Sequence, residues 1–203
     1  MQAHKVATEG QIAGALGFAP CRTIVLVGLM GAGKTNIGRR LAARLGLPFC
    51  DSDNEIEAAA GETVEEIFRN RGERVFRDGE RRVIARLLAQ PVHVLATGGG
   101  AFIDPGTRAL IARRGVSVWL RADLDVLVQR VSRRSNRPLL KGGDASAILA
   151  ELIERRYPIY AQAALVVDSG EGAPEATVAR VMAALAACPL AREPPEAGEE
   201  ETS

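Results

Sequence analysis

The 203-residue sequence has few of the residues that build disulfide frameworks, zinc sites or aromatic nucleic-acid surfaces. Its three cysteines, Cys21, Cys50 and Cys188, form no CxxC pair, which argues against a disulfide framework and is typical of the reducing cytoplasm. Aromatic residues make up 4% of the chain, so a base-stacking surface is not expected. No run approaches the roughly 18 apolar residues of a membrane helix, and the first twenty residues lack a secretory apolar core. We therefore expect a cytoplasmic protein without nucleic-acid or membrane partners.

Net charge is also small, at +1, but it is unevenly distributed. The segment after Leu190, AREPPEAGEEETS, holds five glutamates and one arginine, and residues 1–190 carry a net charge of +5. An acidic, proline-containing end without periodic apolar residues is typical of a solvated, disordered tail. We predict a flexible N-terminal arm over 1–20, one domain over 21–190 and a disordered acidic tail over 191–203.

The predicted domain alternates short β-rich runs with longer helical patterns. Predicted strands cover 23–28, 47–51, 92–97, 116–120 and 164–168, and predicted helices cover 34–45, 53–60, 63–69, 73–89, 105–113, 123–133, 145–156 and 174–187. Thr63 and Glu66 have the spacing of a capping box. Strand–helix alternation indicates an α/β fold with a doubly wound parallel sheet, which binds ligands beyond the carboxyl ends of its strands.

Residues 28–35, GLMGAGKT, match the phosphate-binding pattern GxxxxGK[ST], with a hydrophobic strand before them and a helix after them. Backbone N–H groups of such a loop and the positive end of the new helix hold phosphate. Lys34 can reach the β- and γ-phosphates, and the Thr35 hydroxyl can bind Mg²⁺. The candidate ATP-binding residues of the loop are Gly31, Ala32, Gly33, Lys34, Thr35 and Asn36. This loop predicts nucleoside triphosphate binding but does not separate a kinase from a GTPase or an ATPase.

Asp51 and Asp53 directly follow the second predicted strand, at the edge of the sheet where the phosphate loop lies. One carboxylate can orient Mg²⁺ through water, and the other can hold a substrate hydroxyl and accept its proton. The alternative is that Asp53 is only the N-cap of the next helix. The third predicted strand ends in Thr97 rather than in the aspartate of an ordinary Walker B strand, so Asp51 is the better candidate for the metal. The same departure disfavours GTPase and motor-ATPase functions.

Three glycines follow the third predicted strand, and several arginines occur within or after the predicted helices. Residues 98–100 are three glycines, which permit close approach of a ligand or serve as a plain flexible turn. Arg77, with Glu80 three residues later, suits bidentate recognition of a carboxylate, the alternative being a surface ion pair.

Residues 130–144 are rich in arginine and predict a basic mobile lid over about 134–144, with Arg137 as a charge-stabilising residue; the alternative is a solvated loop. Arg156 is equally compatible with a ligand contact and with a charge at a helix end.

Six motifs in order, GLMGAGKT, DSD, the FR of GERVFRDGE, TGGGA, RPLL and RRYPIY, resemble the shikimate kinases over about residues 22–187. The resemblance implies a P-loop kinase fold whose five-stranded parallel sheet has the order 2-3-1-4-5, with flanking helices and a mobile lid. It also implies ATP-dependent phosphorylation of the 3-hydroxyl of shikimate, with Mg²⁺ as cofactor. We expect a monomer whose partners are ATP and shikimate.

Residue roles follow from the same resemblance. On the ATP side, Lys34 resembles the loop lysine, Thr35 the Mg²⁺ ligand and Asp51 the aspartate that reaches the metal through water. Arg130 and a loop from Asp168 that includes Pro174 resemble the adenine-binding elements, and Arg137 the lid arginine. On the acceptor side the resemblance assigns Asp53 to the hydroxyls and as base, Arg77 and Arg156 to the carboxylate, and Gly99 and Gly100 to the ring. Lys34, Asp53 and Arg137 are then the catalytic residues.

Three alternatives remain open on the sequence. Another small-metabolite P-loop kinase, such as a gluconate kinase, would share the loop and the fold. A non-catalytic binding protein would have lost Lys34 or Asp53, and both are present. A nucleic-acid-binding ATPase is disfavoured by the low aromatic content.

Overall fold

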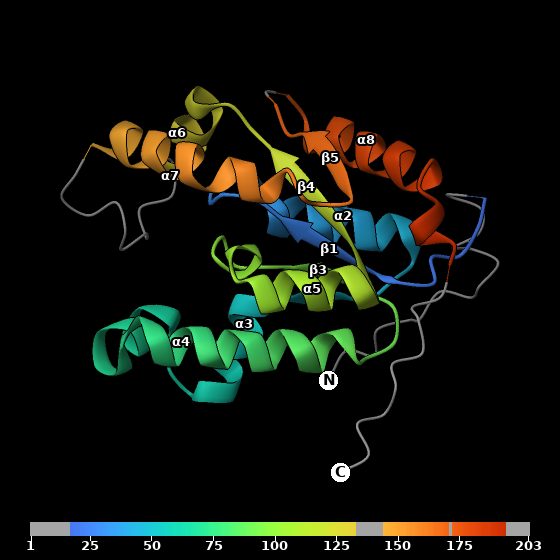
Figure 1. Ribbon diagram of the computed structural model, residues 1–203. Coiled ribbons are helices and arrows are strands. Elements are labelled where there is room, and N and C mark those ends of the chain that lie inside the picture. Colours follow the sequence, from blue (N-terminus) through green and yellow to red (C-terminus); the bar gives the residue numbers. More distant parts are fainter. Residues whose placement is uncertain (1–16, 133–143, 171, 194–203) are drawn as a thin grey trace, which may run out of the picture.

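A computed structural model of the chain describes residues 17–132, 144–170 and 172–193. Its centre is a five-stranded, all-parallel sheet of order β2-β3-β1-β4-β5 (Figure 1). The strands are β1 (Thr23–Val27), β2 (Phe49–Asp51), β3 (Val94–Ala96), β4 (Gly115–Arg121) and β5 (Leu165–Asp168). The predicted order is confirmed. The order switches direction at β1, so the loops after β1 and β3 diverge at the carboxyl edge, where such sheets bind ligands.

Helices connect the strands on both sides of the sheet. They are α2 (Lys34–Leu45), α3 (Ser52–Ala60), α4 (Val64–Leu88), α5 (Pro105–Arg114), α6 (Leu124–Ser132), α7 (Ala145–Tyr160) and α8 (Pro174–Ala186), with single 3-10 turns η1 (Ala101–Ile103) and η3 (Pro189–Ala191). Figure 1 shows α3 and α4 as a layer below α5, with α6 and α7 on the opposite side of the strands. Within the described residues, no helix combines the length and apolarity needed to cross a membrane.

The core forms because β1 is apolar on both faces. Ile24, Val25 and Leu26 are fully buried, and burial of each such side chain stabilises the fold by roughly 1.5–3 kcal/mol. Helix α2 passes so close to β2 that a Cβ on Gly38 would lie 2.6 Å from the Phe49 ring. This close packing holds the start of α2, and therefore the phosphate loop, rigidly above the sheet.

Helices α4 and α7 depart most from the prediction. The helices predicted over 63–69 and 73–89 join as α4, with a break at Gly72, whose φ of 81° lies in the left-handed region. The capping box of Thr63 and Glu66 is confirmed. Helix α7 continues to Tyr160, past Pro158, rather than ending near residue 156. Residues 156–160 thus share one helix, which places Arg156 within α7 and not at its end.

The predictions for the arm, lid and tail concern mostly residues 1–16, 133–143 and 194–203, which lie outside the described residues. Arg137 is among them. Of the predicted arm, Phe18 is described, and its ring lies 4.6 Å from the Arg192 guanidinium carbon. Backbone N–H of Cys21 donates to the Ala191 carbonyl at 3.0 Å. Both ends of the described chain therefore meet at the edge of the domain.

Candidate active site

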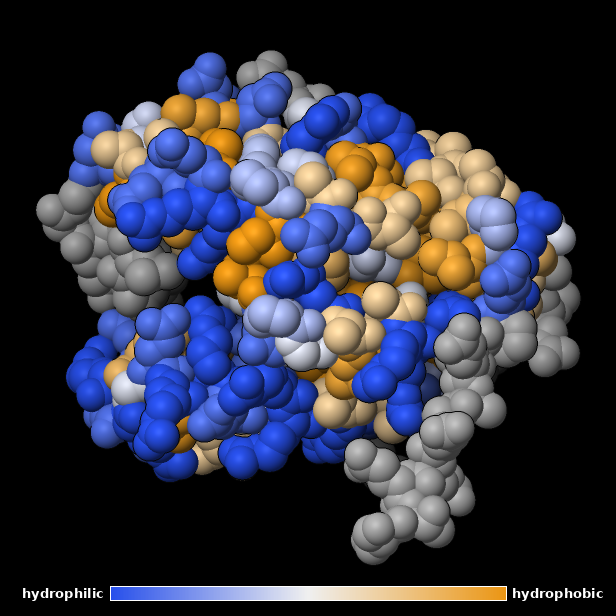
Figure 2. Space-filling view, viewed as in Figure 1, coloured by the Kyte–Doolittle hydropathy of each residue, from blue (hydrophilic) through white to orange (hydrophobic). Residues whose placement is uncertain are grey.

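A cavity of about 410 Å³ opens at the carboxyl ends of the strands. Figure 2 shows the surface hollowed on the side where the α3–α4 layer faces α7. The described residues that line the cavity come from five segments of the chain: Met30, Gly31, Gly33, Lys34, Thr35, Asn36, Ile37, Asp51, Asp53, Thr97, Gly98, Gly99, Arg130, Ser169, Gly172, Pro174 and Thr177. Most of the predicted ATP-binding and metal-binding residues are thus in one place.

The phosphate loop has the backbone that its glycines predict. Gly31 and Gly33 have φ values of 85° and 93°, which other residues rarely adopt. Gly33 precedes α2, so the helix begins at the cavity wall, and the start of a helix presents its N–H groups to a ligand. The Lys34 ammonium folds back to donate to the carbonyls of Gly28 and Leu29, at 2.8 and 2.9 Å. The loop is therefore held in shape by its own lysine, and the charge of Lys34 lies at the cavity wall.

Thr35 and Asp51 form the candidate metal site. The Thr35 hydroxyl donates to Asp51 Oδ2 at 2.8 Å, and Asp51 Oδ1 accepts from the backbone N–H of Asp53 at 3.1 Å. Asp51, and not Asp53, is therefore the N-cap of α3. Mg²⁺ prefers few protein oxygens together with water and phosphate oxygens. A hydroxyl and a carboxylate beside the phosphate loop fit that preference.

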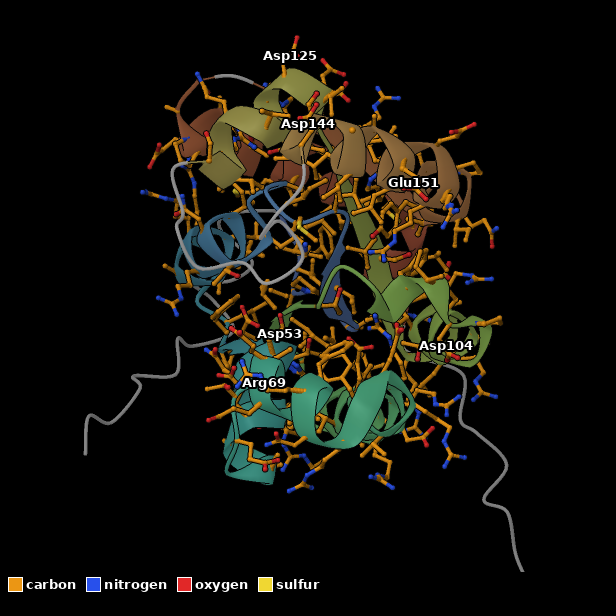
Figure 3. The ribbon with its side chains drawn as sticks, turned by 90° about the vertical axis from the view of Figure 1, so that its left-hand side faces the viewer. Asp53, Arg69, Asp104, Asp125, Asp144 and Glu151 are labelled. Atoms are coloured by element: carbon orange, nitrogen blue, oxygen red, sulfur yellow. The ribbon has the colours of Figure 1, made fainter. Side chains whose placement is uncertain are left out.

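Asp53 and Glu80 converge on Gly98. A Cβ on Gly98 would lie 2.7 Å from Asp53 Oδ1 and 2.9 Å from Glu80 Oε1, so this close approach requires glycine. Burial raises the pKa of Glu80, although Arg77 opposes the shift and the charge of Asp53 adds to it. Figure 3 shows Asp53 at the border between α3 and the strand ends. Asp53 is thus free of the capping role and faces the cavity.

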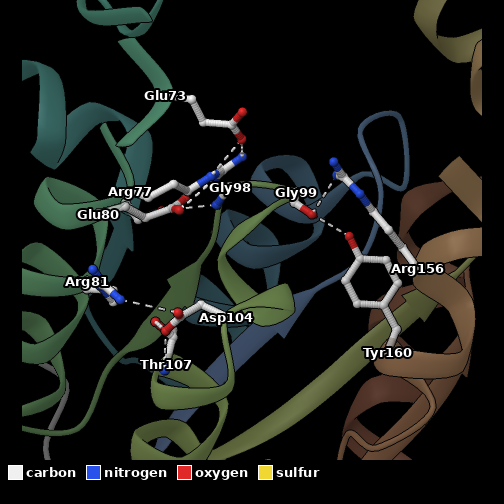
Figure 4. A network of polar contacts seen from close by, with 11 residues as sticks. Glu73, Arg77, Glu80, Arg81, Gly98, Gly99, Asp104, Thr107, Arg156 and Tyr160 are labelled. Atoms are coloured by element: carbon white, nitrogen blue, oxygen red, sulfur yellow. Dashed lines mark hydrogen bonds and ion pairs between the residues drawn. The ribbon is translucent and has the colours of Figure 1, made fainter. Parts of the chain in front are cut away.

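Arg77 is held by a buried partner. Its Nη1 donates to Glu80 Oε2 at 2.7 Å, and Glu80 is 3% exposed. Its Nη2 donates at 3.3 Å to Glu73, an exposed residue. The same guanidinium lies so close to Gly100 that a Cβ there would clash with it. Figure 4 shows Arg77 with Glu73 and Glu80. The ion pair of Arg77 and Glu80 is therefore not a surface pair: the buried Glu80 carboxylate fixes the position of the Arg77 guanidinium.

Arg156 reaches the same turn from the opposite side. Its Nη1 donates to the Gly99 carbonyl at 3.1 Å, and Figure 4 shows Arg77 and Arg156 on either side of the glycines. Two guanidinium groups from α4 and α7 therefore flank one backbone segment that borders the cavity. Guanidinium groups recognise carboxylate and phosphate anions through paired hydrogen bonds.

Arg130 and Ser169 join the phosphate loop to the segment after β5. Arg130 Nη1 donates to Ser169 Oγ at 3.1 Å, and Ser169 Oγ donates to the Ala32 carbonyl at 2.8 Å. Arg130 Nη2 also donates to the Gly170 carbonyl at 2.5 Å, and burial lowers the pKa of Arg130. Sequence analysis did not name Ser169 as a site residue. Its place directly after a strand, at the ligand-binding edge, was the available signal.

The remaining predicted residues are placed as follows. Asn36 lines the cavity and accepts from Arg40 at 3.0 Å, and Pro174 begins α8 at the cavity wall. Asp168 pairs through both oxygens with Arg121, at 2.6 and 3.0 Å, which lowers the pKa of Asp168. Asp168 therefore anchors β5 to β4 and does not line the cavity.

The 2-3-1-4-5 sheet, the phosphate loop after β1 and the acidic pair after β2 define a P-loop kinase. The model of one family, "Shikimate kinase", matches residues 30–186. The chain belongs to the shikimate kinase family.

Sequence relatives agree with that family. The chain is 59% identical over 170 residues to the shikimate kinase of Caulobacter vibrioides, which covers 83% of this chain and 85% of the relative. It is 62% identical over 164 residues to the shikimate kinase of Paramagnetospirillum magneticum, and this match covers 81% of this chain and 84% of the relative. Both matches cover more than four fifths of this chain.

Solved structures separate the two candidate families. The shikimate kinase of Acinetobacter baumannii, in complex with shikimate, superposes with a TM-score of 0.78 at 38% identity, over 83% of this chain and 94% of that one. A gluconokinase from Sinorhizobium meliloti has a TM-score of 0.55 at 20% identity, over 83% and 94%. The gluconokinase match shows a shared fold alone, which is what the sequence predicted for this alternative.

Proposed function

We propose that this protein transfers the γ-phosphoryl group of ATP to the 3-hydroxyl of shikimate, giving shikimate 3-phosphate and ADP. The observation that carries the proposal is the pair Arg77 and Arg156, which flank the glycines of residues 98–100 beside Asp53. Shikimate is a small carboxylate with three hydroxyls, so its site needs cationic donors and a carboxylate acceptor. Both stand next to the phosphate loop. Family membership and the match to a shikimate complex support this acceptor over gluconate.

Residues around the phosphate loop bind the nucleotide. Backbone N–H groups of Gly31 and Gly33 and the N-terminus of α2 hold phosphate oxygens, and Lys34 supplies positive charge to the β- and γ-phosphates. The predicted Ala32 contact is not kept, because its N–H donates to the Leu29 carbonyl at 3.2 Å. Arg130, Ser169 and Pro174 border the adenine side. Mg²⁺ would be held by the Thr35 hydroxyl and, through water, by Asp51; when bound, it neutralises phosphate charge.

Residues around the glycine turn bind the acceptor. Arg77 and Arg156 hold the carboxylate of shikimate. Gly99 and Gly100 have no side chains, so the backbone there can lie against the shikimate ring. Asp53 holds the reacting hydroxyl and accepts its proton as the bond from oxygen to phosphorus forms and the bond to the ADP oxygen breaks. Positioning and electrostatic stabilisation carry this reaction, so no covalent intermediate is needed. Arg137, outside the described residues, is proposed to stabilise the transferred phosphoryl group.

We further propose that the protein acts as a monomer in the cytoplasm. Both of its substrates are small, soluble anions, and the scattered cysteines fit a reducing compartment.

The experiment is an assay of ADP release with shikimate, with gluconate and without acceptor, on the full chain. Lys34→Met serves as the control for contaminating kinases. We expect ADP release with shikimate at least about tenfold above either other condition, with the Lys34→Met protein near background. Equal rates with gluconate, or no release with shikimate from a folded protein, would overturn the proposal.

A further inference from the structure

The carbonyl of Gly99 accepts two hydrogen bonds from one face of α7. Arg156 Nη1 donates at 3.1 Å and the Tyr160 hydroxyl donates as well (Figure 4). Residues four apart on a helix lie on the same face, so both side chains reach the same oxygen. One peptide of the glycine turn (residues 98–100) is therefore tied to α7 through both side chains.

Tyr160 is itself rigidly held. It has no exposed surface, and its ring packs at centroid distances of 5.9 Å from Trp119 and 6.4 Å from Phe102. Burial raises the pKa of Tyr160 to about 12, against the opposing charge of Arg156. Its hydroxyl thus stays protonated at neutral pH and remains a donor in a fixed position.

The other two glycines of the turn are fixed by other helices. The backbone N–H of Gly98 donates to Ser52 Oγ in α3 at 3.0 Å, and Gly100 lies against Arg77 of α4. Gly99 itself borders the phosphate loop, since a Cβ on it would lie 3.5 Å from the backbone nitrogen of Met30. The Gly99 carbonyl is therefore the point where α7 joins a turn that borders both the nucleotide loop and the acceptor site.

Arg156 has two tasks at this point. It donates to the Gly99 carbonyl and, in the proposed function, also binds the acceptor carboxylate. Arg156 is not the sole donor to this carbonyl, because the Tyr160 hydroxyl donates to it as well. The Tyr160 hydroxyl takes no part in binding the acceptor carboxylate.

We propose that Tyr160 is a positioning residue for the acceptor: its hydroxyl fixes the Gly99 carbonyl, and thereby both the glycine turn and the Arg156 guanidinium. This inference rests on the proposed function, because the acceptor it concerns is shikimate. Tyr160 acts through Gly99 and Arg156 and does not touch the reacting atoms.

The test compares Tyr160→Phe with Tyr157→Phe. Tyr157 lies on the same helix, packs its ring 4.8 Å from Trp119 and donates its hydroxyl to the Ala122 carbonyl, outside the cavity. Each variant therefore loses one hydroxyl, with its ring kept in the same aromatic cluster. We expect Tyr160→Phe to raise KM for shikimate about three- to tenfold, with KM for ATP within about twofold of wild type. Tyr157→Phe should leave both KM values within about twofold.

Folding and coupling controls accompany these assays. Thermal melts of both variants set an assay temperature at which each is folded, so that a purely structural loss would lower active-enzyme concentration and not KM. In a double-mutant cycle with Arg156→Lys, the effect of Tyr160→Phe should differ from its effect in wild type by at least about twofold, because both groups act on one carbonyl.

The outcomes separate the two proposals. If wild type phosphorylates shikimate but Tyr160→Phe changes neither KM, or raises both KM values equally, the role of Tyr160 is overturned and the function stands. If wild type releases no ADP with shikimate, the function itself fails. A selective rise in KM for shikimate in Tyr160→Phe alone supports the inference.

Discussion

The Arg77 guanidinium lies directly over the α-carbon of Gly100, so that a Cβ there would come within 2.6 Å of Arg77 Cζ. Glu80 holds the guanidinium from behind, and Gly100 is the surface against which it rests. The absence of a side chain at residue 100 therefore determines where the charge of Arg77 stands.

Gly100→Ala tests this contact. The added methyl group must displace the guanidinium, and we expect KM for shikimate to rise about 10- to 100-fold, with KM for ATP nearly unchanged. The matched control is Gly79→Ala in α4, where a Cβ meets no atom within 4 Å. That variant should keep wild-type kinetics and gain up to about 1 kcal/mol of stability. Wild-type KM for shikimate in Gly100→Ala would contradict the assignment of Arg77.

Asp53→Asn tests the proposed base. The amide keeps the shape of the side chain but cannot accept the proton of the reacting hydroxyl, so kcat should fall about 10²- to 10⁴-fold. Asp51, which caps α3, is unchanged, so the thermal midpoint should stay near that of wild type. Asp125→Asn, an exposed change in α6, controls for loss of negative charge. A kcat within threefold of wild type would remove Asp53 as the base.

Ser169→Ala tests the link between the phosphate loop and the segment after β5. The variant loses the bond to the Ala32 carbonyl and a partner of Arg130. We expect KM for ATP to rise about three- to tenfold and KM for shikimate to stay within about twofold. Ser117→Ala removes another buried hydroxyl, which accepts from the backbone N–H of Ala164, and should lower stability alone. The same kinetic change in both variants would refute a specific role for Ser169.

His93 predicts a loss of stability in acid. The side chain is 2% exposed, its Nε2 has no partner among the described residues, and burial lowers its pKa below the usual 6.5. As pH falls below about 6.5, the unfolded chain binds a proton that the folded protein resists. Protonation thus favours unfolding, and the loss grows until pH reaches the lower, folded pKa.

Urea unfolding of wild type and His93→Gln at pH 7.5, 6.5 and 5.5 measures this effect. Wild type should lose up to about 1.4 kcal/mol more free energy of unfolding per pH unit than the variant below pH 6.5. Glutamine keeps a polar side chain but cannot titrate. At pH 7.5, where His93 is neutral in both the folded and the unfolded protein, the free energies of unfolding should therefore differ only by the effect of the substitution itself. Parallel profiles down to pH 5.5 would exclude His93 as the titrating group.

The sequence by itself determined the fold class and the nucleotide loop. Strand-length runs of β-branched residues separated by helical patterns indicate a parallel sheet, because crossovers between parallel strands are right-handed and short. The strand order was implied by the resemblance to the shikimate kinases. The residues of the phosphate loop lie next to one another in the chain, so their spatial arrangement depends on local backbone geometry. They are Gly31, Gly33, Lys34 and Thr35. The six motifs identified the family through their residue types and their order along the chain, which can be read without a structure.

The tertiary structure decided what each long-range partner does. That Asp51 rather than Asp53 caps α3 depends on how β2 ends beside Thr35, which spacing alone does not determine. Whether the pair of Arg77 and Glu80 is internal depends on the packing of α4, which buries Glu80. Arg156 stands within α7 because the helix continues past Pro158 and carries Tyr160 to the same carbonyl. Burial and convergence depend on contacts between segments far apart in the chain, and such contacts leave no local pattern in the sequence.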